Sequence, residues 1–199
     1  MKAVKKTPSY NLAWALIGIA TTGVSLSMLL ARDARWMQWH LSRLGEGESL
    51  SSAVFNFTLI FAAMVLVLLA VRVTDELTRT PLNQRASLLR TLLFITAMCW
   101  VGVGVFPFDR FPVIHNVFGY GQFFIICSIM LGIRQFSSAF SDRTHTIGYG
   151  AVLITGVMMA FFHLTHFTTL LVVELIGQLF VYAWFLSMTH DLRRTIDQG

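Results

Sequence analysis

Six long apolar runs, separated by short polar segments, dominate the chain. They span about residues 12–31, 53–73, 88–106, 112–133, 147–166 and 168–188. Each run reaches the roughly 20 residues that a helix needs to cross a hydrocarbon core of about 30 Å. A helix also satisfies every backbone polar group internally, as a lipid environment demands. The pattern predicts an all-α polytopic membrane protein, a single bundle of six transmembrane helices.

The first segment between the runs has its own periodicity. In the stretch 34–45, Trp36, Met37, His40, Leu41 and Leu44 recur at helical spacing. Such a segment suits a short helix lying in the membrane interface, either as a lid that fills the mouth of the bundle or as a substrate gate. Gly45 and Gly47 then end it, and Ser49 is placed to cap the second long helix.

Composition agrees with a membrane protein. Of 199 residues, 55% are hydrophobic and 13% charged, and the mean hydropathy is +0.66. The net charge of +5 arises from basic residues that stand singly between apolar runs, which argues against nucleic-acid binding. The two cysteines lie inside apolar runs, where packing is their expected role.

The basic residues also predict an orientation. If both termini are cytoplasmic, eleven of the fifteen Lys and Arg residues lie inside. A bacterial-type plasma membrane is the expected location. The first run is read as a retained span rather than a signal peptide, because it is long and lacks a small-x-small cleavage site. The charged residues of the segment 74–87, including Asp75, Glu76 and Arg79, are expected to form a solvated face.

Polar residues within the spans are costly in lipid and therefore mark candidate sites. In the six-span topology they gather in the outer half, around a hairpin between the third and fourth runs. Together they predict a polar pocket open to the outside. The candidate ligand-binding residues are Asn56, Asp109, Arg110, His115, Asn116, Glu174 and Gln178.

Two of these residues carry most of the chemistry. Glu174 lies among leucines and valines, so its carboxylate requires a partner, for which Gln178, His115 and His163 are the candidates. His115 is expected to bond Asp109, Asn56 or a backbone carbonyl, or to act in acid–base chemistry. If the four outer polar groups converge, His115 should reach Asn56, Asp109 or Glu174 directly or through one water.

A second candidate site is a set of His and Glu residues that could bind zinc. His163 and His166 are three positions apart and can share a helical face, and His115 with Glu174 would complete a tetrahedral set. A hydrogen-bonded or interfacial role for the histidines is the alternative, because the chain has no HExxH pattern.

A resemblance adds to this reading. Glu48 and Ser49 precede a span opening with Phe55 and Asn56, and a later stretch places Gly104, Phe106, Pro107 and Asp109 before His115 and Asn116. This arrangement resembles the bacterial six-span family numbered 998 among the domains of unknown function, and distantly the DRAM and Sfk-type membrane proteins. The resemblance implies a six-helix bundle and importance for Asn56, Asp109 and His115, without a reaction.

Three functions remain open. The first is binding of a lipid headgroup or small amphiphile in the outer pocket, with a role in envelope lipid organisation and with membrane lipids as partners. The second is a hydrolase or transferase, with zinc as an optional cofactor, using His115 with Asp109 or Glu174 as catalytic residues. The third is a proton-coupled transporter, which the absence of midplane polar groups disfavours. No nucleophile with an adjacent base is recognisable, which favours binding. Glycines on the helices suit close packing, within the bundle or against a partner subunit or a second copy.

Overall fold

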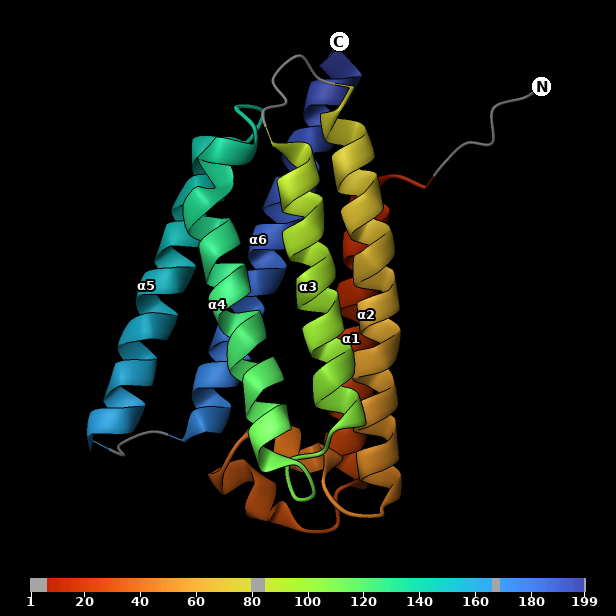
Figure 1. Cartoon of the computed structure of the whole chain (residues 1–199), viewed down its shortest axis with the longest axis vertical. Coiled ribbons are helices and arrows are strands. Elements are labelled where there is room, and N and C mark those ends of the chain that lie inside the picture. The colour runs from red at the N-terminus through yellow and green to blue at the C-terminus, as the bar shows by residue number, and fades with distance from the viewer. Residues whose placement is uncertain (1–6, 80–84, 166–168, 199) are drawn as a thin grey trace, which may run out of the picture.

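The computed structural model describes residues 7–79, 85–165 and 169–198, and within these ranges the backbone forms six long helices (Figure 1). All six are long and apolar enough to cross a membrane, which confirms the predicted all-α class. The helices are α1 (Ser9–Leu30), α2 (Leu50–Leu77), α3 (Ala86–Val105), α4 (Pro112–Phe136), α5 (Asp142–Thr165) and α6 (Leu170–Gln198). Two short 3-10 helices, η1 (Ala34–Gln38) and η2 (Leu41–Gly45), lie between α1 and α2.

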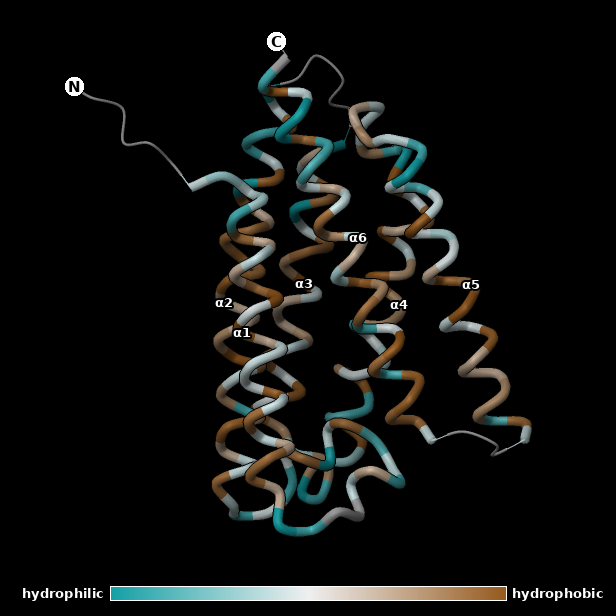
Figure 2. The backbone as a smooth tube through the Cα atoms, turned by 180° about the vertical axis from the view of Figure 1, so that it is seen from behind, coloured by the Kyte–Doolittle hydropathy of each residue, from teal (hydrophilic) through white to brown (hydrophobic). Residues whose placement is uncertain are grey.

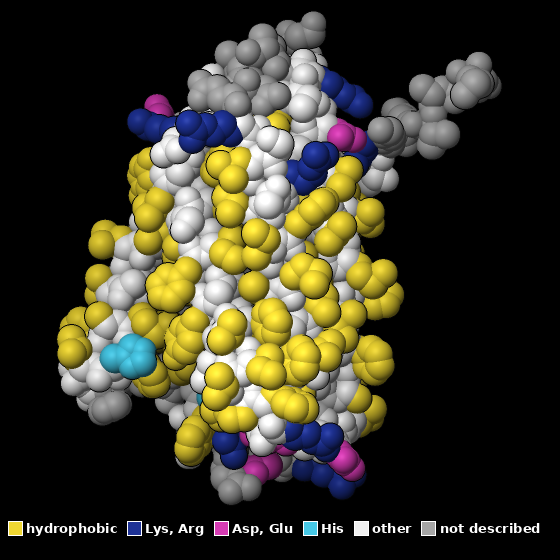
Figure 3. Space-filling view, viewed as in Figure 1, with side chains coloured by type: hydrophobic (Ala, Val, Ile, Leu, Met, Phe, Trp, Pro, Cys, Tyr) yellow, Lys and Arg dark blue, Asp and Glu magenta, His cyan; other side chains and the backbone are white. Residues whose placement is uncertain are grey.

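The surface of the bundle has a broad apolar band. Hydrophobic side chains cover its middle, whereas Lys, Arg, Asp and Glu gather at the two ends (Figure 3). Phe57, Leu164 and Leu179 are 68%, 82% and 66% exposed, respectively. An apolar surface this extensive is unfavourable in water and suits a bilayer. The protein is therefore a multi-pass membrane protein.

Consecutive helices pack side by side from α1 to α4, and α5 packs against α4 and α6. Helix α6 returns to contact α1 and α2. Both described chain ends lie at the same end of the bundle, which we call the terminal end (Figures 1 and 2). The opposite end, called the loop end, holds residues 31–49 and 106–111.

The two halves of the bundle are packed differently. The half toward the terminal end holds the dense core, in which Leu66, Leu93, Ile133, Trp184 and Met188 are fully buried. These residues come from α2, α3, α4 and α6 and pack in one cluster. Close packing of this kind stabilises the terminal half. The loop half is less densely packed and contains a cavity, which is described below.

The terminal end also contains a buried carboxylate, Glu76, which the sequence pattern predicted to be solvated. Glu76 is only 8% exposed, and it accepts hydrogen bonds from the backbone N–H of Ser9 at 2.9 Å and from the Ser9 hydroxyl. A carboxylate at the first turn of α1 satisfies donors that the helix leaves free and complements the helix dipole. The predicted solvated face is thus wrong for Glu76.

The segment 31–49, which we call the cap, folds across the loop end. The single interfacial helix predicted for 34–45 is instead two 3-10 turns. Hydrogen bonds to the bundle replace a continuous helix: Leu171 N–H donates to the Trp39 carbonyl at 3.0 Å, and the Asn56 amide donates to the Gly45 carbonyl at 3.0 Å. Gly47 has a positive φ of 70°, and Ser49 caps α2 in a capping box with Ser52, as predicted for Ser49.

Candidate functional site

A cavity of about 770 Å³ lies in the loop half, beneath the cap and among all six helices. Its walls are mainly apolar, with Trp100 from α3, Ile126 from α4, Phe162 from α5 and Phe185 from α6. This volume falls within the roughly 300–1,000 Å³ of typical ligand pockets. The space is therefore large enough for a sizeable apolar ligand.

The cavity has a side opening within the apolar band. Tyr120 on α4 and Leu175 and Leu179 on α6 line the cavity and are also exposed at 42%, 36% and 66%. The cavity is not enclosed, and these residues mark where it approaches the outer surface. Helix α5 diverges from α4 toward the loop end in both views (Figures 1 and 2). The opening therefore faces the surface that the bilayer covers.

Polar groups close the cavity at its loop end, and His115 is central among them. Its side chain is 5% exposed, with Nδ1 2.8 Å from the Phe106 carbonyl oxygen and Nε2 3.0 Å from the Ser42 hydroxyl oxygen. A carbonyl oxygen can only accept, so Nδ1 carries the proton. In the neutral imidazole Nε2 is then an acceptor, and the Ser42 hydroxyl donates to it.

A second imidazole contacts the same serine from within the cap. His40 Nδ1 lies 2.9 Å from the Ser42 oxygen, and because that hydroxyl donates to His115, His40 donates to Ser42. Burial, with the nearby His115 and Arg43, lowers the pKa of His40 from 6.5 to about 4. His40 is therefore neutral at pH 7.

Glu46 lies behind His40, on the side of that ring away from Ser42. The His40 Nε2 atom is 4.0 Å from Glu46 Oε1. Burial raises the pKa of the Glu46 carboxyl, with Arg43 opposing and Asp109 adding to the effect. The cap thus holds a line of polar groups that runs from Glu46 through His40 and Ser42 to His115.

Helix α6 supplies two further polar groups on one face, four residues apart. The Glu174 carboxylate accepts a hydrogen bond from the Leu41 backbone N–H at 2.5 Å, which fixes the cap immediately before Ser42. Gln178 also lines the cavity, and its side-chain amide interacts with the Tyr182 hydroxyl. An amide nitrogen carries two N–H donors, so Gln178 can also donate to a bound ligand.

The residues predicted as ligand-binding divide into two groups. His115, Asn116, Glu174 and Gln178 line the cavity. The others hold the cap to the bundle: Asn56 through Gly45, Asp109 through the Gly47 N–H at 3.0 Å, and Arg110 through an ion pair with Glu48 at 2.7 Å.

The predicted partners of the two central residues need correction. A direct hydrogen bond from His115 to Asn56, Asp109 or Glu174 was expected, and this prediction is wrong. One ring nitrogen, Nδ1, bonds the Phe106 carbonyl, and the other, Nε2, bonds the Ser42 hydroxyl. The backbone-carbonyl alternative is the one observed. Glu174 likewise bonds the cap backbone rather than Gln178, His115 or His163.

The predicted zinc set is not assembled. His163 is exposed on α5, stacks edge-on with Phe162 at 5.0 Å between ring centroids, and does not line the cavity. His166 lies outside the described residues. Across 7–79, 85–165 and 169–198, no group of three or more His, Cys, Asp and Glu residues is arranged to hold a metal ion.

Sequence reasoning missed Ser42 and His40 as site residues. Both lie in a stretch whose periodicity resembles an interfacial helix, so their polar side chains were assigned no partner within the bundle. The His40-x-Ser42 spacing permits a local hydrogen bond, but no sequence signal links Ser42 to His115, which is 73 residues away. Only the folding of the cap over the bundle brings them together.

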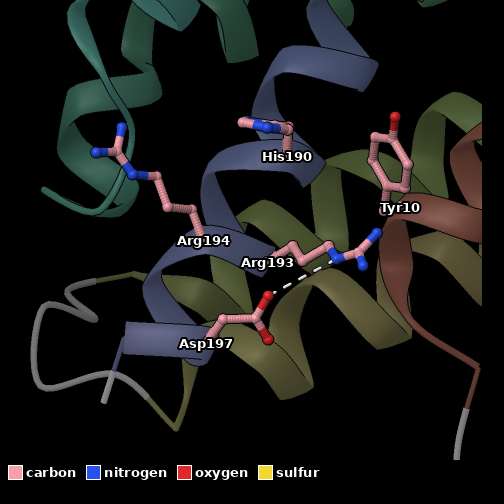
Figure 4. Close-up of a pocket in the computed structure, with 5 residues that line it drawn as sticks. All are labelled: Tyr10, His190, Arg193, Arg194 and Asp197. Carbon is pink, nitrogen blue, oxygen red and sulfur yellow. Dashed lines mark ion pairs between the residues drawn. The ribbon is translucent and has the colours of Figure 1, made fainter.

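A second hollow, of about 630 Å³, lies at the terminal end. Figure 4 shows its lining residues, Tyr10, His190, Arg193, Arg194 and Asp197. The Arg193 guanidinium lies 5.7 Å from the Tyr10 ring centroid and pairs with Asp197 at 3.8 Å. Four of the five residues are exposed at this charged end, so the hollow is a surface groove rather than an enclosed site.

Comparisons with protein-family models, with curated proteins and with solved structures gave no match. The resemblance to the family numbered 998 therefore stays a prediction.

Proposed function

We propose that this protein binds a membrane amphiphile, with the apolar chain in the cavity and the polar group against the cap. The observation that carries the proposal is the cavity itself, whose walls are apolar, whose side opening faces the bilayer and whose far end carries His115, Ser42 and Glu174. A chain entering from the bilayer would exchange lipid contacts for similar apolar contacts, and its polar group would meet hydrogen-bonding partners.

The charge of the cavity indicates the class of polar group. No Lys or Arg is among the described residues that line it, so a phosphate would have no cationic partner there. Its polar groups are instead neutral imidazoles, hydroxyls, amides and one carboxyl. The Gln178 amide can donate to an acceptor oxygen. An uncharged polar group such as a hydroxyl, ester or amide fits these donors and acceptors best.

The distribution of basic residues supports an orientation in which the cap faces outward. Eight of the twelve Arg residues that the structure describes lie toward the terminal end, which the positive-inside rule assigns to the cytoplasm. In a bacterial-type plasma membrane the cavity would then open to the outer half of the bilayer. This location fits a role in envelope lipid organisation.

The proposal is tested by identifying co-purified lipids for the wild type and for one cavity-filling variant. Gly119 lines the cavity and has open space around its Cβ position, so Gly119→Trp fills the cavity. Gly150 has similar open space but does not line it, so Gly150→Trp is the matched control.

We expect native mass spectrometry to find about one amphiphile per chain in the wild type and in Gly150→Trp, and little in Gly119→Trp. Equal lipid content in all three proteins would contradict binding in this cavity.

A further inference from the structure

We propose that Ser42 is a nucleophile and His115 its general base, and that together they transfer the acyl group of an uncharged ester bound in the cavity. This inference rests on the proposed function, because it requires an amphiphile that places an acyl carbonyl at the cap. The proposal goes beyond binding in assigning a reaction to the polar end of the cavity.

The first argument is the geometry of the pair. Ser42 Oγ lies 3.0 Å from His115 Nε2, within the distance at which an imidazole can take a hydroxyl proton. The Phe106 carbonyl accepts from Nδ1 at 2.8 Å and therefore directs the lone pair of Nε2 at the serine. This carbonyl takes the place that a carboxylate often occupies behind the base in serine hydrolases.

The two imidazoles beside Ser42 are not equivalent. His115 accepts the serine proton, whereas His40 donates its own Nδ1 proton to the serine oxygen at 2.9 Å. His115 alone can therefore act as the base for Ser42. His40 is a positioning residue, which orients the serine oxygen from within the cap.

The second argument is the placement of the serine. Ser42 and His115 both line the cavity, so a bound chain has access to the pair. The hydrogen bond from Leu41 N–H to Glu174 anchors the backbone one residue before Ser42 and makes Glu174 a second positioning residue. Nucleophile and base come from the cap and from α4, and α6 holds the cap in register.

The reaction balances with water as the co-reactant. Ser42 Oγ attacks the acyl carbon while its proton moves to His115 Nε2, and collapse of the tetrahedral intermediate breaks the ester C–O bond. His115 then gives the proton to the leaving alcohol, which leaves an acyl ester on Ser42. Water then attacks this ester while His115 takes its proton, and collapse of the second tetrahedral intermediate breaks the ester bond to Ser42 Oγ. His115 returns the proton to Ser42 Oγ, which releases a carboxylic acid and the free serine.

The test uses dodecyl fluorophosphonate, in which serine attack on phosphorus expels fluoride and leaves a covalent adduct. The full-length protein in detergent is labelled, and the modified peptide is located by mass spectrometry. Ser25 provides an internal control: it lines the same cavity and is more exposed than Ser42, but none of its described contacts is with an imidazole. Thermal melting verifies that each variant is folded.

We expect the wild type to be labelled at Ser42 and not at Ser25, and Ser42→Ala to remain unlabelled. His115→Asn should slow labelling at least about a hundred-fold, which is the lower limit of the contribution that a general base makes to a reaction rate. His40→Gln should slow it by less than about ten-fold, because only a positioning hydrogen bond changes. Hydrolysis of para-nitrophenyl dodecanoate should follow the same order.

Absence of labelling in the wild type, labelling at Ser25 instead, or equal rates in the wild type and His115→Asn would overturn the proposal. If His115→Asn does not fold, the site of wild-type labelling and the Ser42→Ala result still decide it. Co-purified lipid is measured on the same samples. If the wild type retains lipid but is not labelled, only the reaction is refuted. If the wild type carries no specific lipid, the proposed function is refuted as well.

Discussion

Glu174 fixes the cap through one hydrogen bond, from the Leu41 backbone N–H. The carboxyl oxygen can be replaced by an amide oxygen without loss of the acceptor, whereas a leucine removes the acceptor and leaves a backbone donor unpaired. The comparison of the two substitutions therefore separates hydrogen bonding from charge at this position.

We expect Glu174→Gln to lower the free energy of unfolding by less than about 1 kcal/mol, and Glu174→Leu by about 1–3 kcal/mol. Thermal melting in detergent measures both values. Equal stability of the two variants would show that the bond to Leu41 contributes little. A Glu174→Gln protein that is stable but retains no lipid would assign the carboxyl a role in ligand binding.

His40 makes the stability of the cap depend on pH. Its pKa is about 4 when folded and near 6.5 when unfolded, because burial and the charges nearby disfavour the imidazolium. Between these values the unfolded state binds more protons, so stability falls as pH falls, by at most about 1.4 kcal/mol per unit. Glu46 acts in the opposite direction, because its pKa is raised on folding.

The contribution of His40 is isolated by comparison with His40→Gln. We expect the wild type to lose more stability than the variant as pH is lowered from 6.5 to 4, measured by melting in detergent. Parallel pH profiles for the two proteins would contradict the low pKa.

For individual residues, the sequence predicted some members of the site but not their hydrogen-bond partners. His115 and Glu174 were recognisable because an ionisable side chain inside an apolar run is costly. Ser42 was not, because a serine in a polar loop is ordinary and its partner is 73 residues away. Glu76 was misassigned for the same reason, since only the fold places Ser9 beside it.

Among the helices, the α2–α3 contact depends on one glycine. A Cβ at Gly104 would lie 2.9 Å from the Asn56 backbone oxygen on α2, and a backbone atom cannot rotate away. Gly156 on α5 has nothing within 4 Å of its Cβ position. The same substitution at the two positions therefore has opposite effects on packing.

We expect Gly104→Ala to destabilise the protein by about 1–3 kcal/mol through overpacking. Gly156→Ala should be neutral or stabilising by up to about 1 kcal/mol, since alanine favours helix. Titration with sodium dodecyl sulfate measures the free energy of unfolding of each variant. A neutral Gly104→Ala would show that α2 and α3 are less closely packed than in this structure.

The helices themselves were largely predictable, because length and hydropathy decide which segments cross a bilayer. The structure extends α2 and α6 past the apolar runs, to Leu77 and Gln198, since charged side chains at the terminal end can leave the bilayer. The cap was predicted less well. Its helical periodicity is real, but a segment this short is marginal as an isolated helix, and bonds to the bundle decide its conformation.

For the whole molecule, the charge distribution predicts an orientation that cysteine labelling can test. Glu48 at the loop end and Arg143 at the terminal end are both exposed. In a background with Cys99 and Cys127 replaced by alanine, an impermeant maleimide should label Glu48→Cys in intact cells and not Arg143→Cys. Permeabilised cells, in which both should react, are the control. If only Arg143→Cys is labelled in intact cells, the protein has the opposite orientation.

Occupation of the cavity by a membrane amphiphile is the central claim, and photocrosslinking tests it most directly. The probe is an uncharged single-chain amphiphile with a diazirine in its chain, added to vesicles that contain the protein. Trp100, Ile126 and Thr155 line the cavity and are 8%, 8% and 7% exposed, so a chain reaches them only from within. We predict crosslinks at these buried residues that disappear in Gly119→Trp. Crosslinks confined to exposed residues of the apolar band, such as Phe57 and Phe61, and unchanged by Gly119→Trp would contradict the claim.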